Sequence, residues 1–184
     1  MKRNTGLSLV ELVITISIMA VLVGFLSISI VSVFGLEARA CASDLNAYLK
    51  ETKTAALSKD YQELKIYTEP TGMKSVDFVV YQYQEDPMNP GVVLPNPVPV
   101  VYKTEHLAKE QVEIRFTFSD GSTLTLGGAA TSVTLAFHRS SGAFAYAKID
   151  DVEITGYCTL IEVERAGKVY QIQLVPSTGK HFIQ

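Results

Sequence analysis

Residues 7–34 read LSLVELVITISIMAVLVGFLSISIVSVF, and Glu11 is the only charged residue among them. A run of this length is sufficient to cross a bilayer, because about 20 consecutive apolar residues span the hydrocarbon core. Lys2 and Arg3 precede the run, so the positive-inside rule places the N-terminus in the cytoplasm and the chain after Phe34 outside. We therefore expect residues 7–34 to form the transmembrane helix of a single-pass protein of the cytoplasmic membrane.

Glu11 is the main candidate for a functional residue in this run. A carboxylate in hydrocarbon is costly, so an acid inside an apolar span marks a site by default. Glu11 would lie roughly 6 Å along a helix that starts at Leu7, at about 1.5 Å per residue. A free α-amino group, from its own chain or from a neighbouring subunit, could neutralise it there. The alternative is that Glu11 only reaches the head-group region and has no further role.

The leader MKRNTG and the residues after it closely resemble the class III signal of type IV prepilins and pseudopilins. Lys2 and Arg3 match the basic leader, Gly6 matches the residue before the cut, and Ser8–Glu11 follow the order small polar, apolar, apolar, acid. The resemblance implies that a membrane prepilin peptidase cuts between Gly6 and Leu7. It also implies that Leu7 is N-methylated and that Glu11 sets the register of subunits in a filament.

Two positions depart from the commonest family pattern. Leu7 stands where Phe is usual, and Ile28 stands where many major pilins have a proline, so no kink is assigned at Ile28. Two other processing routes compete with the prepilin reading. Ala38–Ala40 is an A-x-A triplet of the kind that a secretory peptidase cuts, and Cys41 after it resembles a lipidation site. The preceding apolar run is too long for a secretory signal, whose core has about 7–15 residues.

Length and charge limit the remaining possibilities. A chain of 184 residues has room for one anchor and one modest domain. The formal net charge is −3, and loss of the two basic leader residues Lys2 and Arg3 lowers it to −5. This balance does not favour direct, generic binding of nucleic acid.

Residues 35–60 are expected to continue the helix as an amphipathic half. The segment lacks proline and is rich in Ala, Leu, Glu and Lys, with an apolar stripe predicted at Leu36, Ala40, Leu45, Leu49, Thr52 and Ala56. A helix from Leu7 to about Lys59 would be about 80 Å long. Its first half suits lipid or a bundle of like helices, and its second half suits one docked domain, a division that resembles the pilin helix.

Residues 61–184 have the composition of a β-rich extracytoplasmic head. Strands are predicted at 63–69, 76–83, 112–118, 123–126, 133–138, 144–149, 158–164 and 169–175. Clustered prolines predict a loop over residues 86–100. The fold class expected is α+β and pilin-like, with the long N-terminal helix packed on an antiparallel sheet.

The C-terminal strands carry a second resemblance. Residues 133–145 and 158–182 resemble the closing strands of GspH/FimT-type minor pseudopilins and minor pilins, which end in a similar pattern of strand, Thr-Gly and basic residue. The alternative is that these are ordinary hairpins. The resemblance alone implies a minor role, near the tip of a filament or in its priming.

Signatures of catalysis and of cofactor binding are weak or misleading. The run Ser177–Lys180 lacks the first glycine of a phosphate loop, and the histidines are scattered. Asp150, Asp151 and Glu153 could hold Ca²⁺ through oxygen ligands, but an acidic solvated turn is favoured. We expect no catalytic residue, no cofactor and no metal.

Cys41 and Cys158 both lie outside the membrane in this topology, where disulfides persist. A bridge would stabilise the head by about 4–5 kcal/mol in the chain-entropy model. The alternative is that Cys41 packs as a small apolar residue and Cys158 enters the sheet core.

The sequence thus predicts a non-catalytic structural subunit of a type IV pilus or of a type II secretion or competence pseudopilus. Its expected partners are other pilin or pseudopilin subunits, prepilin peptidase, and an inner-membrane assembly platform whose ATPase acts indirectly. Membrane lipid would surround the helix before assembly, and the subunit would then enter an extracellular or periplasmic filament. The main alternative is a membrane-anchored extracellular β-domain that binds a ligand and never polymerises.

Overall fold

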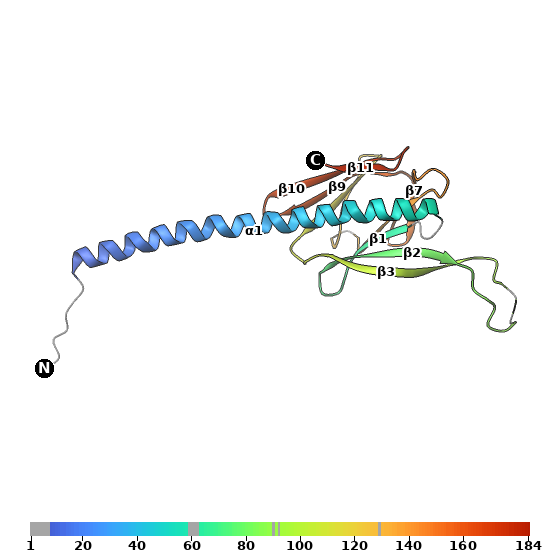
Figure 1. Cartoon of the computed structure of the whole chain (residues 1–184), viewed down its shortest axis with the longest axis horizontal. Helices are drawn as coiled ribbons and strands as arrows, with labels where there is room; N and C mark the ends of the chain where they lie inside the picture. Colours follow the sequence, from blue (N-terminus) through green and yellow to red (C-terminus); the bar gives the residue numbers. More distant parts are fainter. Residues whose placement is uncertain (1–7, 59–62, 90, 92, 129) are drawn as a thin grey trace.

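The computed structural model describes residues 8–58, 63–89, 91, 93–128 and 130–184. A long helix, α1 (Leu9–Ser58), extends well beyond a β-rich head that packs on its C-terminal half (Figure 1). The strands of the head are β1 (Glu63–Thr68), β2 (Lys74–Gln82), β3 (Val98–Ala108), β4 (Glu113–Phe118), β5 (Thr123–Thr125), β6 (Ser132–Phe137), β7 (Phe144–Ile149), β8 (Val152–Ile154), β9 (Cys158–Arg165), β10 (Lys168–Val175) and β11 (Lys180–Ile183). This arrangement confirms the α+β, pilin-like fold expected.

The head contains two sheets where one had been expected. One has six strands in the order β3-β2-β1-β6-β7-β8, and the other has five strands in the order β11-β10-β9-β4-β5. Neighbouring strands in both sheets run antiparallel. Strand alternation cannot reveal this division, because it depends on which strands pair across long stretches of sequence.

The helix is continuous through Gly35, as its proline-free sequence allows. Its buried stripe lies at Ala38, Cys41, Ala42, Leu45, Leu49, Thr52 and Ala56. The prediction was wrong at Leu36 and Ala40, which are exposed. Each lies two residues from Ala38, and two residues correspond to roughly 200° of rotation, so both point away from the head.

One hydrophobic core joins the helix to both sheets. Its largest fully buried side chains include Phe78 of β2, Phe116 of β4 and Phe137 of β6. Leu45 and Leu49 of α1 belong to the same cluster. The apolar faces of the two sheets and the apolar stripe of α1 therefore exclude water together.

The strands predicted from sequence are present, with boundaries that shift by a residue or two. The expected loop over 86–100 is wrong at its end, because β3 begins at Val98 and contains Pro99. Proline is tolerated there because β3 is an edge strand, whose outer backbone need not join a ladder. The short strands β8 and β11 were also missed, and both lie at sheet edges.

Candidate functional site

The start of α1 holds Glu11 in a reciprocal hydrogen-bonded arrangement with Ser8. The backbone N–H of Glu11 donates to Ser8 Oγ at 3.2 Å, and the backbone N–H of Ser8 donates to Glu11 Oε2 at 2.9 Å. This is a capping box, which satisfies two donors that a helix start leaves open. The carboxylate of Glu11 therefore sits at the end of the helix where the dipole favours negative charge. The S-x-x-E spacing in the sequence could have revealed Ser8 as the partner.

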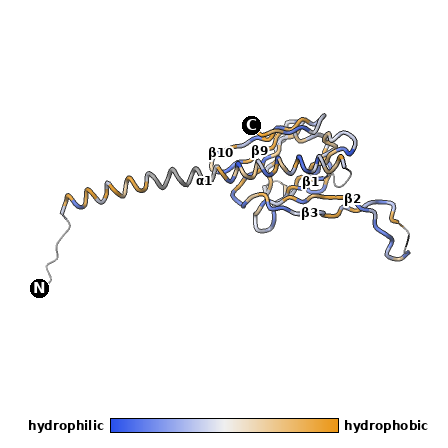
Figure 2. Tube along the Cα trace, viewed as in Figure 1, coloured by the Kyte–Doolittle hydropathy of each residue, from blue (hydrophilic) through white to orange (hydrophobic). Residues whose placement is uncertain are grey.

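Large apolar side chains cover the N-terminal part of α1 without contact with the head. Leu9 is 79% exposed and Leu12 is 51% exposed. The other large exposed apolar side chains, as far as Val23, are also more than half exposed. The tube in Figure 2 is mainly orange over these residues. A helix that is apolar all round is normally buried in lipid or among other helices. This segment therefore presents an apolar surface that the chain itself leaves uncovered.

Hydroxyl groups within this segment are satisfied by the helix itself. Thr15 Oγ1 donates to the carbonyl oxygens of Glu11 and Leu12, both at 2.9 Å, and Ser17 Oγ donates to that of Val13 at 2.8 Å. These internal hydrogen bonds reduce the cost of placing the hydroxyls in an apolar environment.

The predicted cleavage site, Gly6 and Leu7, and the rest of the leader lie outside the described residues. No helix in the described part of the chain has an apolar stretch long enough to cross a membrane. The transmembrane span over residues 7–34 stays a prediction.

A buried ion pair ties α1 to the head near the point where the helix emerges. Arg165 at the end of β9 is only 7% exposed and pairs with Glu37 of α1. Arg165 also donates a hydrogen bond to Gln111 Oε1, and the exposed Lys109 pairs with Glu37 at 3.6 Å. This cluster links the apolar arm to the head through charges as well as through apolar packing.

Cys41 of α1 and Cys158 of β9 are both buried, and their thiols are free. Both belong to the hydrophobic core. Burial raises the pKa of each thiol to about 12, with Asp44 adding to the effect at Cys41. A thiol held in its neutral form is a poor nucleophile and a poor metal ligand.

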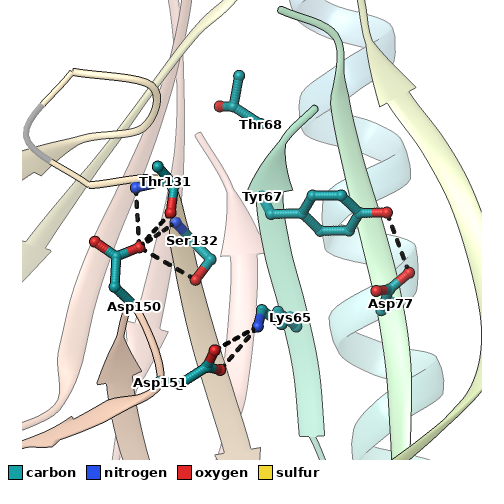
Figure 3. A pocket seen from close by; sticks show the side chains of 8 residues that line it. All are labelled: Lys65, Tyr67, Thr68, Asp77, Thr131, Ser132, Asp150 and Asp151. Carbon is teal, nitrogen blue, oxygen red and sulfur yellow. Dashed lines mark hydrogen bonds and ion pairs between the residues drawn. The ribbon is translucent and has the colours of Figure 1, made fainter. Parts of the chain in front are cut away.

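A hollow of about 530 Å³ lies on the face of the six-stranded sheet, where polar side chains gather (Figure 3). Lys65 Nζ donates to both carboxylate oxygens of Asp151, at 2.8 and 2.9 Å. Asp77 Oδ1 accepts hydrogen bonds from Tyr67 at 3.4 Å and from Thr104 at 2.6 Å. Lys65 and Asp151 therefore form an ion pair in this hollow, whereas hydroxyl groups of neighbouring strands bind Asp77.

Asp150 supports the turn between β7 and β8 at one side of this hollow. Asp150 and Asp151 have φ values of 47° and 66°, the geometry of a tight two-residue hairpin. Asp150 Oδ1 accepts hydrogen bonds from the hydroxyl of Thr131 at 2.6 Å and from its backbone N–H at 2.9 Å, and the backbone N–H of Ser132 donates to it at 2.8 Å. The Thr131 hydroxyl and the Ser132 N–H hold the pKa of Asp150 below its usual value.

Asp150 therefore stabilises the turn between β7 and β8, and Asp151 forms an ion pair with Lys65 of β1. Among the described residues, no group of three or more His, Cys, Asp or Glu side chains is arranged to hold a metal ion.

A second polar cluster surrounds the buried carboxylate of Glu63. Glu63 Oε1 accepts hydrogen bonds from Tyr146, from Tyr81 at 3.0 Å and from the ammonium group of Lys148 at 2.9 Å. Burial lowers the pKa of Lys148, but its hydrogen bonds to Tyr81 and Glu63 raise it more, so the net direction is upward. The sequence did not single out these residues, which come from three strands.

The fold and the apolar arm define a class of protein: a β-rich head carried on a long helix whose N-terminal half is apolar all round. Residues 1–27 match the family model described as the prokaryotic N-terminal methylation motif. No curated protein and no solved structure matches the chain at a significant level. The motif is the class III signal, and its presence is consistent with a type IV pilin-like protein.

The matched segment contains Gly6, Leu7, Ser8 and Glu11. It supports a processed subunit of the pilin or pseudopilin type, and it points to a structural role rather than to catalysis. It also implies membrane anchoring, processing by prepilin peptidase and assembly with other pilin subunits.

Proposed function

We propose that this chain is a structural subunit of a type IV pilus or of a type II secretion or competence pseudopilus. The observation that carries the proposal is the exposed apolar arm of α1, whose described side chains, Leu9 to Val23, lie within the matched methylation motif. In a filament, packing against neighbouring arms would remove this surface from water and from lipid. The head would then face outward.

Glu11 would set the register between subunits. Its carboxylate oxygen Oε2 accepts a hydrogen bond from the Ser8 N–H at 2.9 Å, and this capping interaction keeps the carboxylate at the helix start. Cleavage after Gly6 creates an α-amino group on Leu7, and a neighbouring subunit's amine could pair with Glu11 in the apolar bundle. A charge pair in such surroundings is strong because water does not screen it.

The first test is the N-terminal residue and intact mass of the protein, recovered from membranes of cells that contain prepilin peptidase. A chain that begins with N-methylated Leu7 is expected. An uncut chain that begins near Met1 would favour a plain membrane anchor, and a soluble chain that begins at Cys41 would refute the proposal.

The second test is assembly of a Glu11→Ala variant. We expect the variant to be cut normally but to be lost from the sheared filament fraction by tenfold or more. Asp44→Ala is the matched control, because Asp44 is an exposed acid on the same helix outside the apolar arm. Equal assembly of Glu11→Ala and Asp44→Ala would contradict the proposed role of Glu11 in setting the register.

We also propose that the subunit is a minor one of the GspH/FimT type. The support is the C-terminal hairpin of β9 and β10 followed by β11: the turn before β11 carries Thr178 and Gly179, and β11 begins at Lys180. Quantitative mass spectrometry of sheared filaments tests this proposal, because it gives the number of copies of this chain for each copy of the main filament protein. A minor subunit is expected at well below one copy for each major subunit.

A further inference from the structure

A hollow of about 500 Å³ lies at the end of the six-stranded sheet that is remote from the apolar arm. Its lining residues are Tyr81, Tyr83, Pro97, Arg139 and Tyr146. Tyr83 and Pro97 stand where β2 ends and β3 begins, and the connection between these strands extends away from the arm (Figure 1). We call this site the tyrosine hollow. A ligand can reach it without passing the arm.

Tyr81 and Tyr146 lie on the face of the six-stranded sheet that points away from α1. In β1, Leu64 and Ile66 enter the core, so the alternation of the strand directs Glu63 to the opposite face. The hydroxyls of Tyr81 and Tyr146 both donate to Glu63 Oε1. Figure 3 shows another part of this face, with α1 behind the strands. The tyrosine hollow is therefore separate from the packing between helix and sheet.

The half-buried rings of Tyr81 and Tyr146 are held in place from below. Lys148 Nζ donates to Glu63 Oε1 at 2.9 Å and lies 5.7 Å from the ring centre of Tyr81 and 4.9 Å from that of Tyr146. A buried ion pair contributes little net stability, but its hydrogen bonds fix the groups around it. The two rings are thus ordered before any ligand arrives, which lowers the entropic cost of binding.

The lining combines flat aromatic surface with hydrogen-bond donors. Tyr83 is 66% exposed, and the half-buried Pro97 adds apolar surface beside it. Arg139 is exposed and brings the planar donor group of its guanidinium. Apolar walls with a few placed polar groups are typical of sites for small ligands. This combination suits a ring with apolar faces and hydroxyl groups at its edge, which describes a pyranose sugar.

The charges on this face of the sheet favour a neutral ligand. Lys148 pairs with Glu63 at 2.9 Å, and Lys65 pairs with Asp151 at 2.8 Å. Asp150 adds a further carboxylate to the same face. A polyanion such as nucleic acid is bound through cations that neutralise its phosphates, and the two lysines are already neutralised by carboxylates.

We propose that the tyrosine hollow binds a neutral, β-linked oligosaccharide. A β-linked chain of pyranose rings presents flat C–H faces, which stack on the tyrosine rings, and its hydroxyls at the edge accept hydrogen bonds from Arg139. The subunit would then have a glycan-binding activity in addition to its structural role. The hollow is formed by the head alone, so this activity requires neither cleavage after Gly6 nor assembly.

Titration of the full chain with chitohexaose and with cellohexaose tests the proposal. The protein is kept in a detergent whose head group contains no sugar, and binding is followed by saturation-transfer NMR. Saturable binding of at least one of the two sugars is expected. The C–H protons of the sugar rings should receive the strongest saturation, because they face the tyrosine rings. Absence of saturable binding with both sugars would overturn the proposal.

Variants locate the binding site. Tyr83→Ala is expected to lower the affinity by tenfold or more without a change in the thermal unfolding temperature, because this ring is mostly exposed. Tyr102→Ala is the matched control, since Tyr102 is 69% exposed on β3 and lines a different surface, beside α1. Equal affinities of Tyr83→Ala and the wild-type chain would place sugar binding elsewhere and overturn the proposal.

Two other ligand classes are tested in the same way, with a single-stranded oligothymidylate and with a proline-rich peptide. Binding of either one in place of the sugars, with loss in Tyr83→Ala, would assign the hollow to that class and overturn the proposal. The result is also separate from the test of the proposed function. An uncut chain from membranes would refute the filament subunit, whereas sugar binding would still decide the role of the hollow.

Discussion

Glu63 illustrates how single residues acquire roles that their sequence position does not suggest. Alternation in the strand ELKIYT places Glu63, Lys65 and Tyr67 on one face, where exposure to solvent is the ordinary expectation. Glu63 is nevertheless buried, because Tyr81 and Tyr146 cover it and Lys148 neutralises it. These partners come from β2 and β7, so no local pattern could have identified the cluster.

Replacement of Glu63 by Ala should destabilise the head by about 2–3 kcal/mol, because it leaves a half-buried ammonium group and two hydroxyls without their shared acceptor. Urea unfolding of the full chain in detergent, followed by circular dichroism, measures this. Tyr81→Phe removes only one hydroxyl and should cost about 1 kcal/mol. A loss for Glu63→Ala no larger than that for Tyr81→Phe would contradict the prediction.

His181 should make the head less stable in mild acid. Burial lowers its pKa below the usual 6.5, and the nearby charges of Lys53 and Lys50 act in the same direction. The unfolded chain therefore binds the proton more readily than the folded chain, so stability is complete above pH 6.5 and falls as the pH drops through the folded pKa.

The measurement is the free energy of unfolding at several pH values between 7.5 and 5. His181→Gln should lose less stability over this range than the wild-type chain. His138→Gln, at an exposed position, is the control and should behave as wild type. Identical pH profiles for His181→Gln and the wild-type chain would exclude this role for His181.

At the scale of elements, the turns show which local signals are sufficient. Asp120-Gly121 and Ala166-Gly167 each place a glycine with positive φ in a turn, and these turns connect β4 to β5 and β9 to β10. The hairpin of β7 and β8 was missed because Asp150-Asp151 is a less typical pair for positive φ. Hydrogen bonds from Thr131 and Ser132, 18 or 19 residues earlier, support it.

Gly179 is required by a contact between two turns. Its φ is 59°, and a Cβ there would overlap the carbonyl oxygen of Gly142, while Lys53 Nζ donates to the carbonyl of Thr178 at 2.9 Å. Gly179→Ala should therefore cost more than the roughly 1–2 kcal/mol of left-handed backbone strain. Gly121→Ala, with φ of 83° and open space around the Cβ, should show the strain alone. Thermal unfolding of both variants compares them, and equal losses would contradict the contact.

At the scale of the whole molecule, the decisive feature is the junction between the apolar arm and the head. Among the described side chains of α1, the buried apolar stripe begins at Ala38, and Glu37, one residue earlier, pairs with the buried Arg165. The sequence shows both residues but cannot show that they meet, because they lie far apart along the chain. The junction determines how the arm leaves the head, and therefore how a filament would position successive heads.

Glu37→Gln should destabilise the head by about 2 kcal/mol, because it leaves a buried guanidinium without its carboxylate. Lys109→Ala removes an exposed partner of the same carboxylate and should change stability by less than about 1 kcal/mol. Urea unfolding of the two full-length variants tests the difference. Similar, small effects would show that Arg165 does not depend on Glu37.

The amino-acid pattern alone specifies the apolar arm, the acid at its start, the long helix and most strands of the head. Each of these depends on residues close together in the chain: an uninterrupted apolar run, a spacing of three and four, or an alternation of two. The motif match at residues 1–27 agrees with that local information. The division into two sheets, the burial of Glu63 and the pairing of Glu37 with Arg165 appear only after folding. They depend on contacts between distant segments, which sequence periodicity does not encode.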